Sequence, residues 1–396
     1  MLSRHNERYP TRMVGERHRA LIKRLQDLHV PLNGSLAFLS NWTYFVHDPS
    51  QYGQLISTGP YAGTLGALTA GAKFRTRYAH LLPPDRKTRL WASDSRRDIE
   101  TARFFATGFF GPDWEQDQRA ELEIIPESFD RHTDTLTPGY TCKNYIQDSV
   151  QGHDYGKNMQ VAFQEVYIPP IAHRLIHEQG NHAVGNFSNL EVYSMQEMCG
   201  FETMARGSSP WCNVFTPADW AHFEYARDVL HYYRGGPGNP YAGAMGWLWL
   251  NATANLLETG PEVGTLFLSF VHDNDVTSML TALDLFRDPK YDPNLPVTHI
   301  ARDRVWQMST VLPMGGRITF ERLYCSARGG SFVRINVNDG IIPLPDCHSG
   351  PGGSCSVERF VDLIRKRRGE VDDFVQVCGT SGDRSEGLTF LRQPGP

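Results

Sequence analysis

Apolar residues recur at helical spacing in several parts of the chain. Between residues 15 and 30, Leu21, Ile22, Leu25 and Leu28 alternate with arginine and lysine, which predicts an amphipathic helix. The same spacing predicts helices over 61–80, 218–233 and 245–257, one that begins at the polar turn of residues 93–95, and one through 360–364. The chain is therefore rich in helices that each have one apolar face.

Other apolar stretches indicate strands. Residues 265–271 form a nearly continuous apolar run, as expected for a strand covered on both faces. Residues 90–93 form a shorter run that ends in a polar turn, and 318–323 and 332–337 are strand candidates. Asn338, Asp339 and Gly340 then predict a hairpin turn into 341–343. Between these strands, residues 111–257 carry Gly, Pro and Asn between helical patterns, which predicts a mostly helical insertion.

The overall composition is that of an ordinary globular chain. Its 396 residues allow about two domains, and no run of about twenty apolar residues predicts a membrane span. The net charge of -5 argues against a protein that coats nucleic acid, so anion binding would depend on local arginine clusters. The densest basic run, residues 365–368, is interpreted as the solvated end of a helix.

Cysteines and glycosylation signals favour the secretory pathway. The chain has seven cysteines and four N-glycosylation sequons, which start at Asn33, Asn41, Asn186 and Asn251. We therefore expect N-glycans and a secreted or cell-wall protein. No signal-peptide pattern precedes residue 4, so we expect a trimmed chain or an incomplete gene model, which also fits the odd number of cysteines.

The first candidate for chemistry is the run Arg4-His5-Asn6-Glu7-Arg8-Tyr9-Pro10. Two guanidinium groups suit phosphate oxygens and disfavour protonation of the histidine between them, which leaves a ring nitrogen able to attack phosphorus. The alternative is a surface loop with scattered basic residues, because so short a pattern arises often by chance.

Two further segments can complete such a site. Arg97 lies where a strand breaks into a helix, and a helix N-terminus beside an arginine is a natural phosphate site. An ion pair with a surface carboxylate is the alternative for this arginine. His272-Asp273 follows the buried strand and offers a donor and a carboxyl group. The other His-Asp pairs, at residues 47–48 and 153–154, follow no buried strand and are predicted to be structural.

Taken together, these segments resemble the histidine acid phosphatases, in the branch of fungal phytases and secreted yeast-type acid phosphatases. The family opens with R-H-G-x-R-x-P, which residues 4–10 match except at Asn6, and its H-D motif is matched by residues 272–273. Arg97 falls where the family has its distal phosphate-binding arginine. Further matches lie in residues 211–216 and 333–347, so the resemblance covers essentially the whole chain.

The resemblance implies an α/β fold with a mixed sheet flanked by helices, similar to phosphoglycerate mutase, with an inserted mostly helical domain. We assign residues 1–110 and 258–396 to the α/β domain and 111–257 to the insertion. It also implies three disulfides, Cys199–Cys212, Cys347–Cys355 and Cys142–Cys378. Cys325 is left over, because its counterpart in this branch is bridged to a cysteine upstream of the opening motif. A free buried cysteine is the alternative.

The implied activity is hydrolysis of small phosphate monoesters without a metal or other cofactor. His5 would attack phosphorus to give a phosphohistidine, and Asp273 would protonate the leaving alcohol. The phosphoryl oxygens would be bound by Arg4, Arg8, Arg97 and His272. An acidic optimum follows, because the carboxyl group of Asp273 must be protonated when it acts.

Two departures from the family pattern bear on activity. If the glycine position requires a positive φ, Asn6 is the least costly substitute. Only three residues precede Arg4, so we expect the central strand that precedes the motif to be missing and the nucleophile to be poorly placed. A non-catalytic secreted glycoprotein of the same fold is thus one alternative.

Substrate preference is open between simple monoesters and inositol hexakisphosphate. Arg12, Arg17 and Arg19 lie where phytases have lysine-rich stretches, but they fit a solvated helix face equally well. Residues 59–65 and 109–112 look closer to the yeast-type phosphatases. We therefore expect an acid phosphatase of broad specificity, with phytase activity as the alternative.

Overall fold

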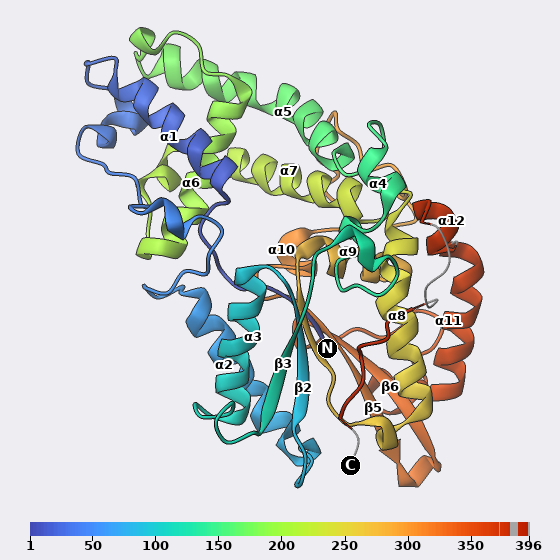
Figure 1. Ribbon diagram of the computed structural model, residues 1–396. Helices are drawn as coiled ribbons and strands as arrows, with labels where there is room; N and C mark the ends of the chain where they lie inside the picture. The colour runs from blue at the N-terminus through green and yellow to red at the C-terminus, as the bar shows by residue number, and fades with distance from the viewer. Residues whose placement is uncertain (372, 381–386, 395–396) are drawn as a thin grey trace.

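A computed structural model describes residues 1–371, 373–380 and 387–394 of the chain. Its centre is a sheet to which all the described strands belong (Figure 1). These strands are β1 (Leu2–Arg4), β2 (Thr88–Ser93), β3 (Ala120–Ile125), β4 (Leu268–Val271), β5 (Arg317–Cys325), β6 (Gly330–Val337), β7 (Gly340–Ile341) and β8 (Cys355–Ser356).

The sheet is mixed. Its order is β3-β2-β4-β1-β5-β6-β7, with β8 also paired to β6. The strands from β3 to β1 run parallel, whereas β5 to β8 join by antiparallel pairing. The apolar run after residue 265 becomes β4, which is buried along its whole length as expected for an inner parallel strand. The hairpin predicted at Asn338–Gly340 is confirmed by the pairing of β6 with β7.

Helices cover both faces of this sheet (Figure 1). One face packs against α2 and α3, and the other against α8, α9 and α11. These helices are α2 (Gly63–Tyr78), α3 (Arg96–Phe110), α8 (Ala242–Thr259), α9 (Asp273–Ala282) and α11 (Val357–Val371). The predicted α/β fold, a mixed sheet flanked by helices, is confirmed.

A helical lobe extends from the end of the sheet at which β1, β2 and β4 finish (Figure 1). It contains α1 (Arg12–Gln26), α4 (Lys143–Gln147), α5 (Tyr155–His173), α6 (Asn189–Arg206) and α7 (Pro217–Gly235). The short helices α10 (Met308–Val311) and α12 (Phe374–Cys378) complete the set. The helical character predicted for residues 111–257 is thus present.

Two elements cross the boundaries that we assign from the sequence. Strand β3 lies in the range given to the insertion, yet it pairs with β2 along its full length and forms the edge of the sheet. Helix α1 lies in the range given to the α/β domain, yet it packs against α6 in the lobe (Figure 1). The division into 1–110 with 258–396 and 111–257 stays a proposal, and 372, 381–386 and 395–396 lie outside the described residues.

The expectation that the central strand is missing is wrong. Residues 2–4 form β1 between β4 and β5, and Leu2 is 1% exposed. The amine of Met1 donates to the carbonyl oxygen of Phe267 at 2.7 Å, and burial lowers the pKa of that amine to about 5. Three residues suffice because both neighbouring strands supply hydrogen-bond partners to β1.

The structure contains the three disulfides that the family resemblance implies. They join Cys142 to Cys378, Cys199 to Cys212, and Cys347 to Cys355. Cys325, at the end of β5, has a free thiol and is half-buried. Among the helices that the structure describes, none is both long and apolar enough to cross a membrane.

Candidate active site

His5 lies at the point where the parallel strands of the sheet end. It directly follows β1, and its backbone N–H donates to the carbonyl oxygen of Val271, the last residue of β4, at 3.0 Å. The N–H of Gly315 donates to the carbonyl oxygen of His5 at 2.9 Å. The imidazole is therefore fixed at the carboxyl end of the sheet, where α/β proteins place their ligands.

A hydrogen bond selects the tautomer of His5. Its Nδ1 atom lies 2.9 Å from the carbonyl oxygen of Asn6. Because a carbonyl oxygen can only accept, Nδ1 carries the proton, and the lone pair of the neutral ring is on Nε2. The ring nitrogen available for attack is therefore Nε2.

The surroundings of His5 keep its ring neutral. Burial is the largest cause that holds the pKa of His5 well below its ordinary value, since the side chain is 2% exposed. The charges of Arg8, Arg4 and Arg97 lower the pKa further. The sequence predicts the effect of the arginines but not that burial exceeds it.

The three arginines that act on the charge of His5 come from a strand, a loop and a helix. Arg4 ends β1, Arg8 lies in the loop after it, and Arg97 is in the first turn of α3. Burial, followed by the charges of Arg97 and Arg4, lowers the pKa of Arg8. Arginines that destabilise one another in this way form a site that an anion stabilises.

Asp273, the first residue of α9, contacts this cluster through Arg4. Nη2 of Arg4 donates to Oδ2 of Asp273 at 2.8 Å, and Nη1 donates to the carbonyl oxygen of Leu312. Burial alone would raise the pKa of Asp273, but the charge of Arg4 holds it well below its ordinary value. Asp273 is therefore ionised in the ligand-free protein, and it must gain a proton before it can act as the proton donor expected from the sequence.

His272 lies beside His5 and Arg97. Its ring centroid is 6.1 Å from that of His5, and its Nδ1 atom is 3.0 Å from Nη2 of Arg97. The structure thus brings together all six residues that the sequence suggests, His5, Asp273, Arg4, Arg8, Arg97 and His272.

The sequence misses the carboxylates around His272. Glu127 follows β3 with Oε1 2.6 Å from Nε2, and Asp98 in α3 lies 3.0 Å from Nδ1. Asp275 accepts from the backbone N–H of His272 at 3.1 Å. Asp98 and Asp275 lie next to candidate residues in the sequence. Glu127 could be found only from the pairing of β3 with β2, which brings the end of β3 to the site.

Comparison with known proteins assigns this arrangement to a family. Residues 1–338 match the histidine phosphatase superfamily (branch 2). The chain belongs to this superfamily. It is 33% identical to phytase PHO112 of Candida albicans, over 98% of this chain and 82% of that protein. It is 32% identical to acid phosphatase PHO1 of Komagataella pastoris, over 97% and 80% of the respective chains.

A solved structure agrees with the superfamily assignment. The crystal structure of the phytase from D. castellii superposes with a TM-score of 0.89 at 29% identity, and covers 98% of this chain and 82% of that one. The likeness therefore extends through both the sheet and the helical lobe.

The superfamily motif has glycine where this chain has Asn6, and the structure shows how asparagine fits. Asn6 does not have a positive φ, so the conformational reason considered from the sequence is wrong. Instead, two glycines face its side chain. A Cβ atom on Gly66 would lie 2.5 Å from Nδ2 of Asn6, and one on Gly315 would lie 3.0 Å from it. The asparagine occupies space that these glycines leave open.

The other His-Asp pairs lie outside the site. His153 and Asp154 contact each other at 3.1 Å on the surface, and Asp48 caps a short 3-10 helix. Both pairs have local structural roles, in line with the prediction.

Asp98, Glu127 and His272 are also the described group that most resembles a metal site, since their donor atoms lie within 4.8 Å of one another. Two ligands of one cation, each about 2.1 Å from it, lie roughly 3 Å or more apart. The 2.6 Å between Nε2 of His272 and Oε1 of Glu127 is instead that of a direct, charge-assisted hydrogen bond. The group is an ion-paired imidazole.

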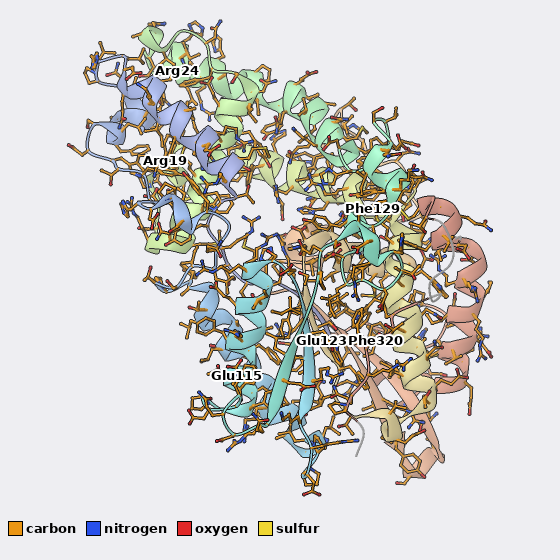
Figure 2. All side chains as sticks on the ribbon, viewed as in Figure 1. Arg19, Arg24, Glu115, Glu123, Phe129 and Phe320 are labelled. Carbon is orange, nitrogen blue, oxygen red and sulfur yellow. A yellow bond between two sulfur atoms is a disulfide. The ribbon has the colours of Figure 1, made fainter. Side chains whose placement is uncertain are left out.

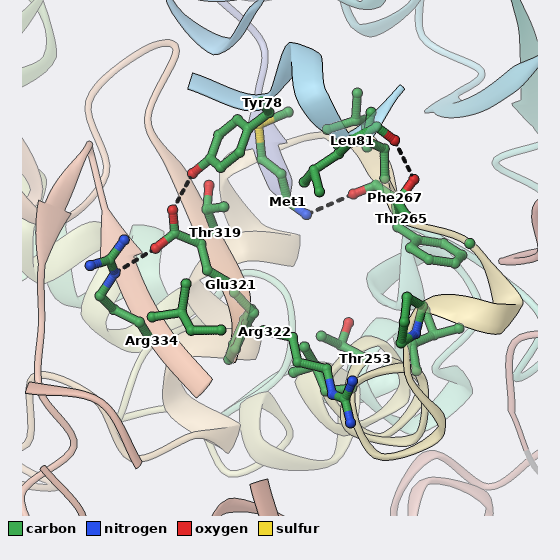
Figure 3. Close-up of a pocket in the computed structure, with 18 of the residues that line it drawn as sticks. Met1, Tyr78, Leu81, Thr253, Thr265, Phe267, Thr319, Glu321, Arg322 and Arg334 are labelled. Carbon is green, nitrogen blue, oxygen red and sulfur yellow. Dashed lines mark hydrogen bonds and ion pairs between the residues drawn. The ribbon is translucent and has the colours of Figure 1, made fainter. Parts of the chain in front are cut away.

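A separate cavity of about 450 Å³ lies at the other end of β1 (Figure 3). It is lined by Met1, Phe267 and Thr319 among others, and by none of the six candidate residues. The carboxylate of Glu321 on its wall accepts from Tyr78 and Arg334, each at 2.6 Å (Figure 3). This cavity lies outside the candidate active site.

Proposed function

We propose that this protein is an acid phosphatase that hydrolyses phosphate monoesters through a phosphohistidine at His5. The observation that carries the proposal is the hydrogen bond from Nδ1 of His5 to the carbonyl oxygen of Asn6. It leaves a neutral ring with its lone pair on Nε2, beside three guanidinium groups that can hold a phosphoryl group. The names of the acid phosphatase and phytase relatives support the same reaction class.

In the proposed first step, Nε2 of His5 forms a bond to phosphorus while the bond from phosphorus to the ester oxygen breaks. Arg4, Arg8 and Arg97 bind the phosphoryl oxygens, and the positive charge of His272 also acts on them. These groups are already in place before the substrate arrives, so they stabilise the negative charge of the transition state without reorganisation.

The leaving oxygen needs a proton, and Asp273 is the group proposed to supply it. The ligand-free carboxylate is ionised because Arg4 faces it. A bound phosphoryl anion competes for Arg4 and so raises the pKa of Asp273. Below about pH 6 a phosphate monoester also carries a proton of its own. The substrate can therefore bring the proton that Asp273 passes to the leaving alcohol, which gives an acidic optimum.

The second step returns the enzyme to its first state. The leaving alcohol departs, water takes its place, and Asp273 accepts a proton from that water as its oxygen bonds to phosphorus. The bond from Nε2 to phosphorus breaks, and phosphate is released. No metal or other cofactor is part of this scheme.

Simple monoesters are the proposed substrates, because the arginines considered for a highly phosphorylated ligand are engaged elsewhere. Arg17 is paired with Glu197, and Arg19 donates to the hydroxyl of Tyr52. Figure 2 shows Arg19 with Arg24 on α1 in the helical lobe. A cavity of about 690 Å³ beside Arg4 is lined by apolar residues such as Trp220 and Met308, and also by charged residues such as Arg227 and Glu224.

Phytase activity is the second candidate. It is favoured by the 33% identity to the Candida albicans phytase and by the fold shared with the D. castellii phytase. Competition between an aryl phosphate and phytate in one assay separates the candidates. A kcat/KM at least about tenfold higher for the aryl ester supports broad specificity, and the reverse ratio supports a phytase.

Secretion with N-glycans belongs to the same proposal. The sequon asparagines Asn33, Asn41 and Asn186 are exposed on the helical lobe, whereas Asn251 is half-buried within α8. We therefore expect glycans at the first three positions when the protein is made in a secretory host. Peptide mapping by mass spectrometry checks their occupancy.

Phosphate release from an aryl phosphate near pH 5, with a chelator present, tests the main proposal. The expected result is turnover that the chelator does not change and that His5→Ala removes. No release from either an aryl phosphate or phytate would leave the non-catalytic glycoprotein as the better description. Release that the chelator abolishes would contradict the metal-independent scheme.

A further inference from the structure

Both ring nitrogens of His272 face carboxylates. Nε2 lies 2.6 Å from Oε1 of Glu127, and Nδ1 lies 3.0 Å from Oδ2 of Asp98. Nε2 donates to Glu127, whereas Nδ1 faces both Oδ2 of Asp98 and Nη2 of Arg97, each at 3.0 Å. Asp275 also accepts from the backbone N–H of His272. Three carboxylates around one imidazole favour its charged form.

The groups around His272 come from five segments. Arg97 and Asp98 lie in α3, Glu127 follows β3, Asp273 and Asp275 begin α9, and Tyr140 and His5 have their rings within 6.4 Å and 6.1 Å of the imidazole. Nη2 of Arg97 is 3.0 Å from Nδ1, and it can only donate. Two cationic groups this close need negative charge nearby, both before and after phosphate binds.

Of the three carboxyl groups around His272, Glu127 is the one that remains ionised over the widest pH range. Burial raises the pKa of Asp98, and burial raises the pKa of Asp275 to about 8. Burial acts in the same direction on Glu127, but the hydrogen bond and charge of His272 outweigh it and lower the pKa of Glu127. Burial would lower the pKa of His272, yet the charge of Asp98, the hydrogen bond of Glu127 and the charge of Asp275, in that order, raise it to about 9. At acidic and neutral pH the pair is thus imidazolium and carboxylate.

We propose that Glu127 is a positioning residue that holds His272 as an imidazolium beside the phosphoryl site, so that phosphate binding persists into the neutral and mildly alkaline range. The inference deepens the proposed function and rests on it, because the bound phosphoryl group is what the imidazolium serves. Glu127 does not contact the substrate in this account. It acts through His272, whose charge lies close enough to His5 to stabilise a phosphoryl group held there.

The test compares inorganic phosphate binding at pH 5 and pH 8 by calorimetry, in the wild-type protein, Glu127→Gln and Glu127→Asp. In the wild-type protein we expect His272 to be charged at both pH values. Asp98 and Asp275 remain in Glu127→Gln, but the loss of the Glu127 hydrogen bond should lower the pKa of His272, so that more of the imidazole is neutral at pH 8. We expect phosphate affinity at pH 8 to fall about tenfold relative to the wild-type protein, with little change at pH 5, and Glu127→Asp to restore part of it.

Glu115→Gln is the matched control, because Glu115 is an exposed residue far from the site at the other end of α3 (Figure 2). It removes the same charge, and we expect no change at either pH. Histidine NMR titration of the wild-type protein and Glu127→Gln gives a second readout that needs no activity. One resonance, absent in His272→Asn, should titrate at a lower pH in Glu127→Gln than in the wild-type protein.

Three results would overturn the inference. Equal weakening at both pH values would show that Glu127 only maintains the fold. Tighter binding at pH 8 in Glu127→Gln would show that Glu127 competes with phosphate for His272. A neutral His272 in the wild-type protein at pH 8 would remove the premise. Since these are binding and NMR measurements, a protein that binds phosphate but hydrolyses no monoester would contradict the proposed function and leave this test intact.

Discussion

His5 and His272 lie with their ring centroids 6.1 Å apart, yet their surroundings are opposite. His5 is packed among Arg4, Arg8 and Arg97, with its Nδ1 proton directed at a backbone carbonyl. His272 is packed among Glu127, Asp98 and Asp275. Burial disfavours the charged form of both rings, so the neighbouring charges decide the difference. One imidazole is held neutral with a free lone pair, and the other is held charged.

The two histidines therefore suit different roles in one site: His5 can act as the nucleophile, and His272 can stabilise negative charge. A nucleophile must be unprotonated, and a group that stabilises developing negative charge is best when charged. The carboxyl ends of three parallel strands bring the two environments together, because β1 leads to His5, β4 to His272 and β3 to Glu127. Substitutions in the two environments should therefore change activity in different ways.

Removing the nucleophile should have the largest effect. We expect His5→Ala to lower kcat for an aryl phosphate by about 10⁴-fold or more, because the variant lacks the ring nitrogen that is proposed to attack phosphorus. His153→Ala, in the exposed His-Asp pair, is the matched control and should keep wild-type activity. Steady-state assays with melting temperatures for both variants make the comparison, and a His5→Ala protein that retains turnover would refute the assignment.

Removing the proton donor should have a smaller effect that depends on the leaving group. We expect Asp273→Asn to slow hydrolysis of an alkyl phosphate by about 10²- to 10⁴-fold. An ester of a nitrophenol should lose much less, because its leaving oxygen needs little protonation. Asp154→Asn serves as the control. An equal loss on both substrates would show that Asp273 acts by orienting Arg4 rather than by moving a proton.

Removing one of the arginines should raise the pKa of His5 and so favour its charged form, which is the form expected for His272. Arg8 lowers the pKa of His5, so Arg8→Gln raises it. Since His5 attacks only when neutral, activity in the variant should be lost at a higher pH as the solution is acidified. We expect the acidic limb of the kcat/KM profile to shift by roughly one unit toward higher pH. The control variant Arg12→Gln should have the wild-type profile. A shift toward lower pH would contradict the sign of this effect.

The packing that supports the His5 side can be tested through stability. Gly66→Ala places a Cβ atom 2.5 Å from Nδ2 of Asn6 and should destabilise the protein by about 1–3 kcal/mol. The double variant Asn6→Gly with Gly66→Ala should recover most of that loss, because the clashing atoms are gone. Denaturant unfolding of the two single variants and the double variant gives the coupling free energy between the two positions. Additive losses would show that the two residues do not share this space.

Features that depend on local sequence are the ones that could be predicted. The apolar run before His272 marks a buried strand, and the turn before Arg97 marks a helix start, so both residues are placed from adjacent positions alone. The hairpin after residue 337 follows from its turn residues in the same way.

Features that depend on distant pairing could not be predicted. Glu127 reaches His272 only because β3 joins the sheet edge, although its segment lies among helical patterns. The strand at residues 2–4 is too short to show a pattern and exists because β4 and β5 hold it on both sides. The fit of Asn6 depends on glycines at positions 66 and 315, far away in the sequence.

The central claim is that Nε2 of His5 becomes covalently bound to phosphorus. Rapid mixing with an aryl phosphate, an alkaline quench that preserves phosphohistidine, and peptide mass spectrometry test it most directly. The account predicts a phosphoryl group on His5, and ³¹P NMR of the quenched protein should show the Nε2 isomer. Phosphate on His272, the Nδ1 isomer, or no covalent intermediate while product forms would contradict it.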